Sequence, residues 1–167
     1  HFGAGKLPDE LIEEMAVVYE CAANPVWPMP GLRETFRELR ERNLSLGIVS
    51  NAQFYTPYMF PAFLDATLPD LGFDENLMIF SYEFREGKPS RRLYAELKSR
   101  GMNPEKTLYI GNDMLKDILP SGAEGFQTVL FAGDQRSLRW RRDDERMRNC
   151  QPDVVITSLD QITQLLP

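Results

Sequence analysis

Two patterns of apolar residues alternate along this chain of 167 residues. In some stretches apolar residues recur every three or four positions, which predicts amphipathic helices, and in others they form short unbroken runs, which predict buried strands. The expected helices cover residues 11–22, 32–43, 90–101, 113–119 and 158–165. The expected strands cover residues 44–49, 77–80, 107–110, 128–131 and 153–156. Helix and strand therefore alternate along most of the chain.

This alternation indicates an α/β fold of the Rossmann-like type. Strands that are apolar on both faces suit a mostly parallel sheet with helices on both faces. The length and the 43% hydrophobic content fit one domain with a sizeable core. Three prolines between residues 25 and 30 make the chain stiff and extended, which predicts a boundary there. We therefore expect a separate helical element over residues 1–25 and an α/β core over residues 26–167.

The composition narrows the range of partners. A net charge of −6 and a pI near 4.9 disfavour a general affinity for nucleic acid or anionic membrane, so we expect a small solute. Acidic residues interrupt a group of arginines between residues 136 and 148, which favours a solvated connection over a nucleic-acid patch. Cys21 and Cys150 are too isolated to indicate a disulfide framework or a zinc site. This use of cysteine fits a reducing cytoplasm, so we predict a cytoplasmic protein. No apolar run approaches the roughly 20 residues of a membrane span, so we expect the protein to be soluble.

Polar residues follow three of the predicted strands, at the edge where parallel sheets bind ligands. Ser50 and Asn51 end the strand 44–49 and can hydrogen-bond a phosphoryl oxygen without adding charge. The polar loop after the strand 77–80 carries Lys88, a point positive charge suited to a phosphoryl group or a carboxylate. These residue types predict a site for a phosphorylated ligand.

Asn112, Asp113 and Asp117 follow the strand 107–110. Asp113 and Asp117 are four residues apart, which places them on one face of the helix that begins there. Their oxygen atoms suit Mg²⁺, which keeps several waters and takes only one or two protein carboxylates together with substrate phosphate. The three residues are therefore candidate metal ligands.

Each motif also has a purely structural explanation. Asp113 can serve only as a helix cap, because aspartate is a preferred capping residue. Ser50 and Asn51 are common turn residues, and a lysine such as Lys88 is commonplace in surface loops. The order of the motifs, their position at strand ends and their residue types together favour a phosphoryl-transfer site.

In these stretches the chain resembles the haloacid dehalogenase superfamily. The matching segments are residues 46–51 (LGIVSN), 87–89 (GKP) and 109–118 (YIGNDMLKDI), within a resemblance that covers residues 26–160. It implies a magnesium-dependent phosphohydrolase that acts on a small phosphorylated metabolite through an aspartyl-phosphate, which divides one difficult displacement into two easier ones. It also implies that residues 1–25 are the tail of a helical cap.

The resemblance assigns a role to each candidate residue. Ser50, with Asn51, would bind the phosphoryl group, and Lys88 would stabilise the nucleophile and the transferred charge. Asn112 or Asp113 would bind Mg²⁺, because the family's usual glycine-aspartate is written here as Gly111-Asn112-Asp113. Asp117 would orient the shell of that metal.

The larger departure from the family is the nucleophile. Its Asp-x-Asp motif occurs nowhere in the 167 residues, so we expect this chain alone to be inactive. An N-terminal segment or a separate fragment would supply the motif on a central strand between the strands that end at Ser50 and Ile110. These two strands should then not be hydrogen-bonded to each other. The alternative is a non-catalytic phosphate-binding or regulatory module on the same fold.

Overall fold

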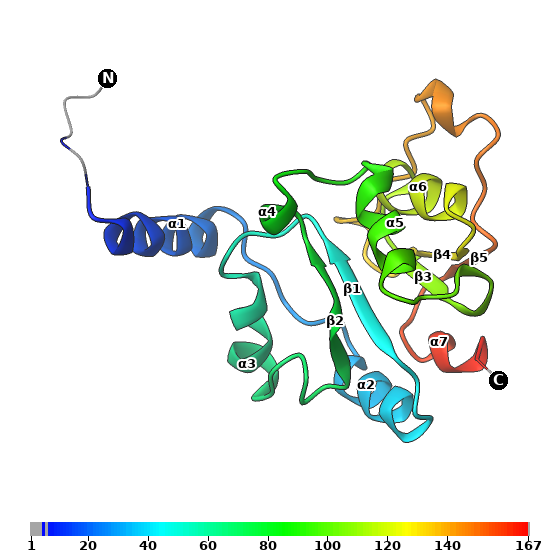
Figure 1. Cartoon of the computed structure of the whole chain (residues 1–167), viewed down its shortest axis with the longest axis horizontal. Helices are drawn as coiled ribbons and strands as arrows, with labels where there is room; N and C mark the ends of the chain where they lie inside the picture. Colours follow the sequence, from blue (N-terminus) through cyan, green and yellow to red (C-terminus); the bar gives the residue numbers. More distant parts are fainter. Residues whose placement is uncertain (1–4, 6, 167) are drawn as a thin grey trace.

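The strands form two parallel sheets (Figure 1). In the computed structural model, which describes residue 5 and residues 7–166, β1 (Leu46–Ser50) pairs with β2 (Phe73–Phe80). The second sheet has the order β3 (Leu108–Gly111), β4 (Gln127–Phe131) and β5 (Val154–Ile156). Each pairing is parallel, which confirms the predicted α/β fold.

The first half of β2 was hidden from the sequence pattern. The strand begins at Phe73 rather than at Leu77, and residues 74–76 are polar and exposed. Its buried residues lie in the second half, where Ile79 is fully buried. An apolar run marks only the buried part of a strand, so the prediction began too late.

The helices alternate with the strands as expected, with differences at their ends. Their bounds are α1 (Asp9–Ala23), α2 (Leu32–Glu41), α3 (Met59–Leu64), α4 (Ser81–Phe84), α5 (Arg91–Ser99), α6 (Leu119–Ala123) and α7 (Gln161–Gln164). Single turns cover Thr56–Tyr58, Pro104–Lys106 and Glu145–Met147, and a π-helical turn covers Met114–Ile118 before α6.

Local contacts are visible at the start of two helices. The last helix begins at Gln161 rather than at Ser158, although the Gln161 side chain accepts the backbone N–H groups of Thr157 and Ser158 as in a capping box. Ser90 caps α5 as predicted, by accepting the backbone N–H of Arg92. The short helices α3 and α4 had no clear sequence signal.

Helices cover both faces of the strands. One apolar cluster joins Leu93 and Leu97 of α5 to Val49 of β1 and Tyr109 of β3. Another of the four apolar clusters joins α2 and α7 to the second sheet and includes Ile110. Because neighbouring residues of a strand point to opposite faces, Tyr109 and Ile110 show that these two helical layers lie on opposite sides.

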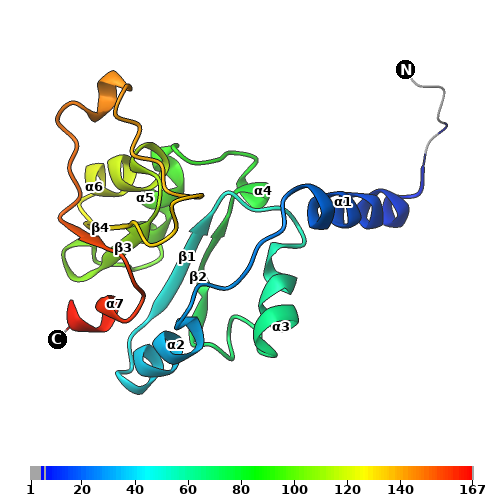
Figure 2. The same cartoon turned by 180° about the vertical axis from the view of Figure 1, so that it is seen from behind.

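Within the described residues, β1 pairs only with β2, and β3 pairs only with β4. The prediction that the strands ending at Ser50 and Ile110 are not hydrogen-bonded to each other is therefore confirmed. In both views β1 lies between β2 and the second sheet (Figures 1 and 2). A side chain reaches across, since the Tyr109 hydroxyl lies 3.5 Å from the Val49 carbonyl oxygen.

Helix α1 projects from the rest of the molecule (Figure 2). It has no buried residue, and Val18 and Tyr19 are 63% and 70% exposed. An element of its own over residues 1–25, and its assignment as the tail of a cap, stay predictions, and residues 1–4, 6 and 167 lie outside the described residues. Among the described helices, none is both long and apolar enough to cross a membrane.

Candidate active site at the carboxyl ends of the strands

An open hollow of about 330 Å³ lies where β1 and β3 end. It brings together all six predicted site residues, although they come from three separate stretches of sequence. Four further residues line it that the sequence analysis did not select. The lining residues are Ser50, Asn51, Lys88, Asn112, Asp113, Lys116, Asp117, Ser137, Arg139 and Arg141.

Lys88 connects the ends of the two sheets. Its Nζ donates to Asp117 Oδ1 at 2.6 Å and to the Val49 carbonyl oxygen at 3.2 Å. The Lys88 and Asp117 side chains are only 14% and 4% exposed. The ammonium group is thus fixed in the hollow by one carboxylate and by one carbonyl at the end of β1.

Asn51 holds the loop that carries Lys88. The Lys88 backbone N–H donates to Asn51 Oδ1 at 2.6 Å, and Asn51 Nδ2 donates to the Lys88 carbonyl oxygen at 3.2 Å. The loop passes so close that a Cβ on Gly87 would lie 3.1 Å from Asn51 Oδ1. Both polar atoms of the amide therefore position Lys88, and the predicted contact of Asn51 with substrate stays a prediction.

Asp117 folds back onto the turn after β3. Its Oδ2 accepts the backbone N–H groups of Asn112 and Asp113 at 3.1 and 3.0 Å. A Cβ on Gly111 would lie 2.3 Å from the Asp117 Cβ, so this turn has room for glycine alone. Asp117 consequently organises the turn and anchors Lys88. Asp113, in contrast, is the extended residue that precedes the π-helical turn, so the two acids do not simply share one face of an α-helix.

Tyr109 lies beneath this ion pair. Its hydroxyl is 3.5 Å from Asp117 Oδ1, and its ring packs edge-on against Tyr94 with centroids 5.0 Å apart. Burial, with the neighbouring Tyr94 and the Asp117 carboxylate, raises the pKa of Tyr109 well above its usual value. Tyr109 therefore stays protonated and can donate a hydrogen bond.

Asp113 is both a cap and a member of an ion pair. Its Oδ1 accepts the backbone N–H groups of Leu115 and Lys116, as the capping alternative predicted. Arg141 Nη2 donates to Oδ2 at 2.7 Å, and Arg141 Nε lies 3.3 Å from Oδ1. Burial by itself raises the pKa of Asp113, but the Arg141 guanidinium and the two backbone donors outweigh it and lower the pKa below its usual value. The carboxylate is charged at neutral pH.

Ser50 and Asn112 keep oxygen atoms available. Within the described part of the chain, the Ser50 hydroxyl has no hydrogen-bond partner. Asn112 Nδ2 donates to the Ser137 carbonyl oxygen at 2.9 Å, which leaves Asn112 Oδ1 without a donor among the same residues. The Ser50 hydroxyl can donate to or accept from a ligand in the hollow, and Asn112 Oδ1 can accept from a ligand or bind a cation.

The donor chemistry fits a partial magnesium site. Asn112 Oδ1 and Asp113 Oδ2 are hard oxygens, and Oδ2 accepts a single hydrogen bond. Both carboxylate oxygens of Asp117 accept hydrogen bonds from the protein, so Asp117 suits a position outside the direct ligands of a metal ion. The described residues contain no group of three or more His, Cys, Asp or Glu side chains that could hold a metal ion. A magnesium ion here would thus need ligands beyond the carboxylates of this chain.

The sequence analysis missed Lys116, Ser137, Arg139 and Arg141. The arginines between residues 136 and 148 were expected to form a solvated connection, and for Arg141 this was wrong because it pairs with Asp113. The available signal was the alternation of apolar Leu138 with the basic residues around it. The prediction used only the charge of this stretch and not the alternation of its apolar and basic residues.

Comparisons with known proteins agree with this geometry. The haloacid dehalogenase-like hydrolase family model matches residues 3–131. A ribulose-1,5-bisphosphate 5-phosphatase of Halopiger xanaduensis is 27% identical over 93% of the chain and 59% of its own length. A glyceraldehyde 3-phosphate phosphatase of Methanocaldococcus jannaschii is 29% identical over 83% of the chain and 56% of its own length. The chain therefore spans somewhat more than half the length of these curated relatives.

Solved structures share the fold. A phosphatase of the same superfamily from Thermococcus onnurineus aligns with a TM-score of 0.67 and 20% identity, over 92% of this chain and 63% of that one. The L-2-haloacid dehalogenase of Xanthobacter autotrophicus aligns with a TM-score of 0.63 and 20% identity, over 96% and 68% of the two chains. The family model covers most of the chain, and the motifs that carry the resemblance meet in one hollow. The chain belongs to the haloacid dehalogenase-like hydrolase family.

Proposed function

We propose that this chain forms the phosphoryl-binding and metal-binding part of a magnesium-dependent phosphohydrolase for a small phosphorylated metabolite. The observation that carries the proposal is the position of Lys88, whose ammonium group is fixed between Asp117 and the end of β1. The curated relatives support it, since their names describe phosphatases of small sugar phosphates. A fixed cation in a hollow lined by hydroxyl and amide groups suits a phosphoryl group.

The residues of this chain would position the phosphoryl group and the magnesium ion. The Ser50 hydroxyl would donate to a phosphoryl oxygen, and Lys88 would stabilise negative charge on that group and on the nucleophile. Asn112 and Asp113 would hold Mg²⁺, with Asp117 orienting its surroundings through the turn after β3. The ion would supply electrostatic stabilisation of the transferring group.

The nucleophile would come from an Asp-x-Asp segment outside these 167 residues. Among the described residues, β1 and β3 each have one edge without a strand partner, and this supports the step because such edges offer backbone hydrogen bonds to an intervening strand. That segment could belong to the same polypeptide or to a separate fragment. We also propose a cytoplasmic location, which is supported by the free thiols of Cys21 and Cys150.

The test is phosphate release from generic phosphate esters by the product of the whole reading frame, with and without Mg²⁺. We expect activity only with the metal, and a loss of about a hundredfold for Asp113→Ala, since removing one electrostatic group of a transition-state site has effects of this order. The matched control is Asp144→Ala, because Asp144 also pairs with an arginine but lies outside the hollow. A folded product without activity would contradict the proposal and favour the non-catalytic module.

A further inference from the structure

The segment that follows β4 supplies one wall of the hollow. Arg139 and Arg141 line the hollow, whereas Leu138 and Trp140 pack into an apolar cluster that includes Met114 and Ile118 of the π-helical turn. Successive residues thus face opposite sides, as in a strand. A parallel bridge between Arg139 and Asp113 is consistent with this extended conformation.

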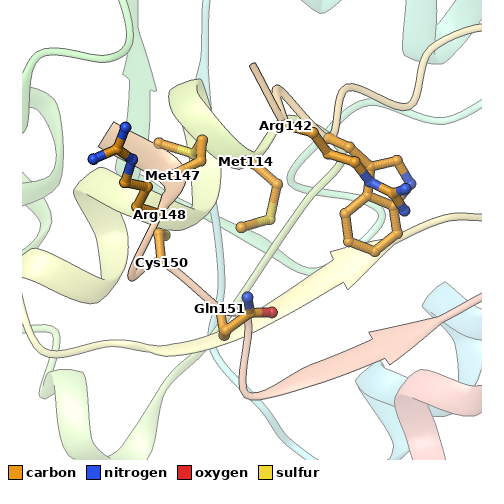
Figure 3. Close-up of a pocket in the computed structure, with 7 residues that line it drawn as sticks. Met114, Arg142, Met147, Arg148, Cys150 and Gln151 are labelled. Atoms are coloured by element: carbon orange, nitrogen blue, oxygen red, sulfur yellow. The ribbon is translucent and has the colours of Figure 1, made fainter. Parts of the chain in front are cut away.

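The other side of the segment faces a second hollow of about 370 Å³ (Figure 3). Figure 3 shows Met114 between Met147 and Arg142 there. The Arg142 guanidinium lies over the Trp140 ring, 5.3 Å from its centroid. The apolar anchors on this side decide which basic residues face the active-site hollow and which do not.

Hydrogen bonds fasten the segment to the turn after β3. The Arg139 N–H donates to the Asn112 carbonyl oxygen, and the Met114 N–H donates to the Arg139 carbonyl oxygen, both at 2.9 Å. The Asn112 side chain adds its bond to the Ser137 carbonyl oxygen. The wall is therefore built into the site and is not a loose loop beside it.

The hollow contains more positive than negative groups. Lys88 pairs with Asp117 and Arg141 pairs with Asp113. Lys116 and Arg139 have no carboxylate partner among the described residues. The cations of the hollow are Lys88, Lys116, Arg139 and Arg141, and its carboxylates are Asp113 and Asp117. Two positive charges thus remain uncompensated, in a chain whose net charge is −6.

Arg139 is held in a way that leaves part of its guanidinium available. Its Nη1 donates to the carbonyl oxygens of Arg136 and Leu138 at 2.7 and 2.9 Å. Its Nε and Nη2 have no acceptor within the described residues. A guanidinium fork of this kind matches the two oxygens of a phosphate or a carboxylate.

We propose that Lys116 and Arg139 form a second anion subsite, so that the substrate is a small phosphate ester with a second phosphate or carboxylate group. This inference rests on the proposed function, in which Ser50 and Lys88 hold the phosphoryl group that is released. The second group contacts Arg139 on the wall formed by residues 137–141 and Lys116 on the π-helical turn, and it does not take part in the chemistry. It selects doubly anionic substrates over simple phosphate esters.

The experiment measures binding to this chain by calorimetry at fixed ionic strength, so it does not depend on turnover. The probes are propyl phosphate, propane-1,3-diol bisphosphate and 3-phosphonooxypropanoate, which separate a second phosphate from a second carboxylate. The variants are Arg139→Gln and Lys116→Gln. The matched control is Arg142→Gln, since Arg142 is close in sequence but faces the other hollow. Circular dichroism checks the fold of each variant.

We expect at least one doubly anionic probe to bind about tenfold more tightly than propyl phosphate, which is the size of one charge-assisted hydrogen bond. Arg139→Gln and Lys116→Gln should each remove most of this gain, and Arg142→Gln should keep it. Equal affinity for all probes, or a gain that survives in both Arg139→Gln and Lys116→Gln, would overturn the inference. The Ser50→Ala variant separates a failure of the second subsite from a failure of the proposed function. If Ser50→Ala does not weaken the binding of propyl phosphate, the proposed function fails; if it does, only the second subsite has failed.

Discussion

Lys88 and Asp117 form a nearly buried ion pair, and the two residues differ in the other hydrogen bonds that hold them in place. Asp117 also accepts hydrogen bonds from two backbone N–H groups. The Lys88 ammonium group is held by Asp117 and by the Val49 carbonyl oxygen, and the Lys88 backbone is held by a hydrogen bond to Asn51. Removing one member of a buried pair typically costs about 3–5 kcal/mol, because the other charge stays buried without a partner. The pair is consequently a rigid means of presenting one positive charge to a ligand.

The ion pair between Arg141 and Asp113 makes the free energy of unfolding depend on pH. In the folded protein the pKa of Asp113 is lowered, so its contribution to the free energy of unfolding is present above the unfolded pKa of about 3.9. That contribution is lost as the pH falls through the lowered folded value. In Arg141→Gln, burial is opposed only by the backbone donors, and we expect the pKa of Asp113 to rise.

Carbon-13 NMR titration of the Asp113 carboxyl group checks this prediction. Arg141→Gln should also be less stable than the unchanged protein at neutral pH, and it should lose less stability as the pH falls below about 4, because the stabilisation that came from the lowered pKa of Asp113 is already absent. Arg146→Gln is the control, because Arg146 pairs with Asp144 and should leave Asp113 unaffected. An unchanged Asp113 titration in Arg141→Gln would show that the ion pair does not hold the carboxylate.

At the scale of elements, the turn from β3 into the π-helical turn decides where the acids lie. Gly111 ends β3 with no side chain, and the Asp117 carboxylate occupies the space beside it. The next residues extend into Asp113, which caps Leu115 and Lys116. The end of β3, Gly111 and the Asp117 carboxylate therefore form one structural unit.

Gly111→Ala should disrupt this unit. We expect a loss of about 3 kcal/mol in the free energy of unfolding, at the upper end for overpacking, since the new Cβ would lie 2.3 Å from Asp117 Cβ. The control is Gly122→Ala inside α6, where a Cβ would meet only Thr128 Cγ2 at 3.5 Å and helix propensity favours alanine. Urea denaturation measures both, and equal stability of the two variants would refute the close packing of Asp117 on Gly111.

Sequence patterns predicted the parts of the fold and site that local order controls. The apolar runs located β1, β3, β4 and β5, and strand-end positions selected Ser50, Lys88 and Asp113. They could not show the polar half of β2, because its side chains face solvent. They also could not show the pairing of Arg141 with Asp113, since these residues are far apart in sequence and are brought together by the packing of Leu138 and Trp140 and by the backbone bridge between Arg139 and Asp113.

At the scale of the whole molecule, two small sheets face each other with edges that lack a strand partner among the described residues, and the candidate site is a hollow at their carboxyl ends. Its surface is acidic overall, yet this hollow has an excess of positive charge. An anionic ligand would therefore be favoured at this one place on a chain that otherwise repels anions. The proposed function requires that phosphoryl transfer takes place in this hollow.

The most direct test compares two lysines in the product of the whole reading frame. Lys88 and Lys98 both form 2.6 Å ion pairs, with Asp117 and Glu124, but Lys98 lies outside the hollow. We predict that Lys88→Met lowers magnesium-dependent phosphate release by about 100- to 1000-fold while Lys98→Met leaves it nearly unchanged. Circular dichroism and thermal unfolding confirm that both variants fold. A folded Lys88→Met protein that releases phosphate as fast as Lys98→Met would contradict the account.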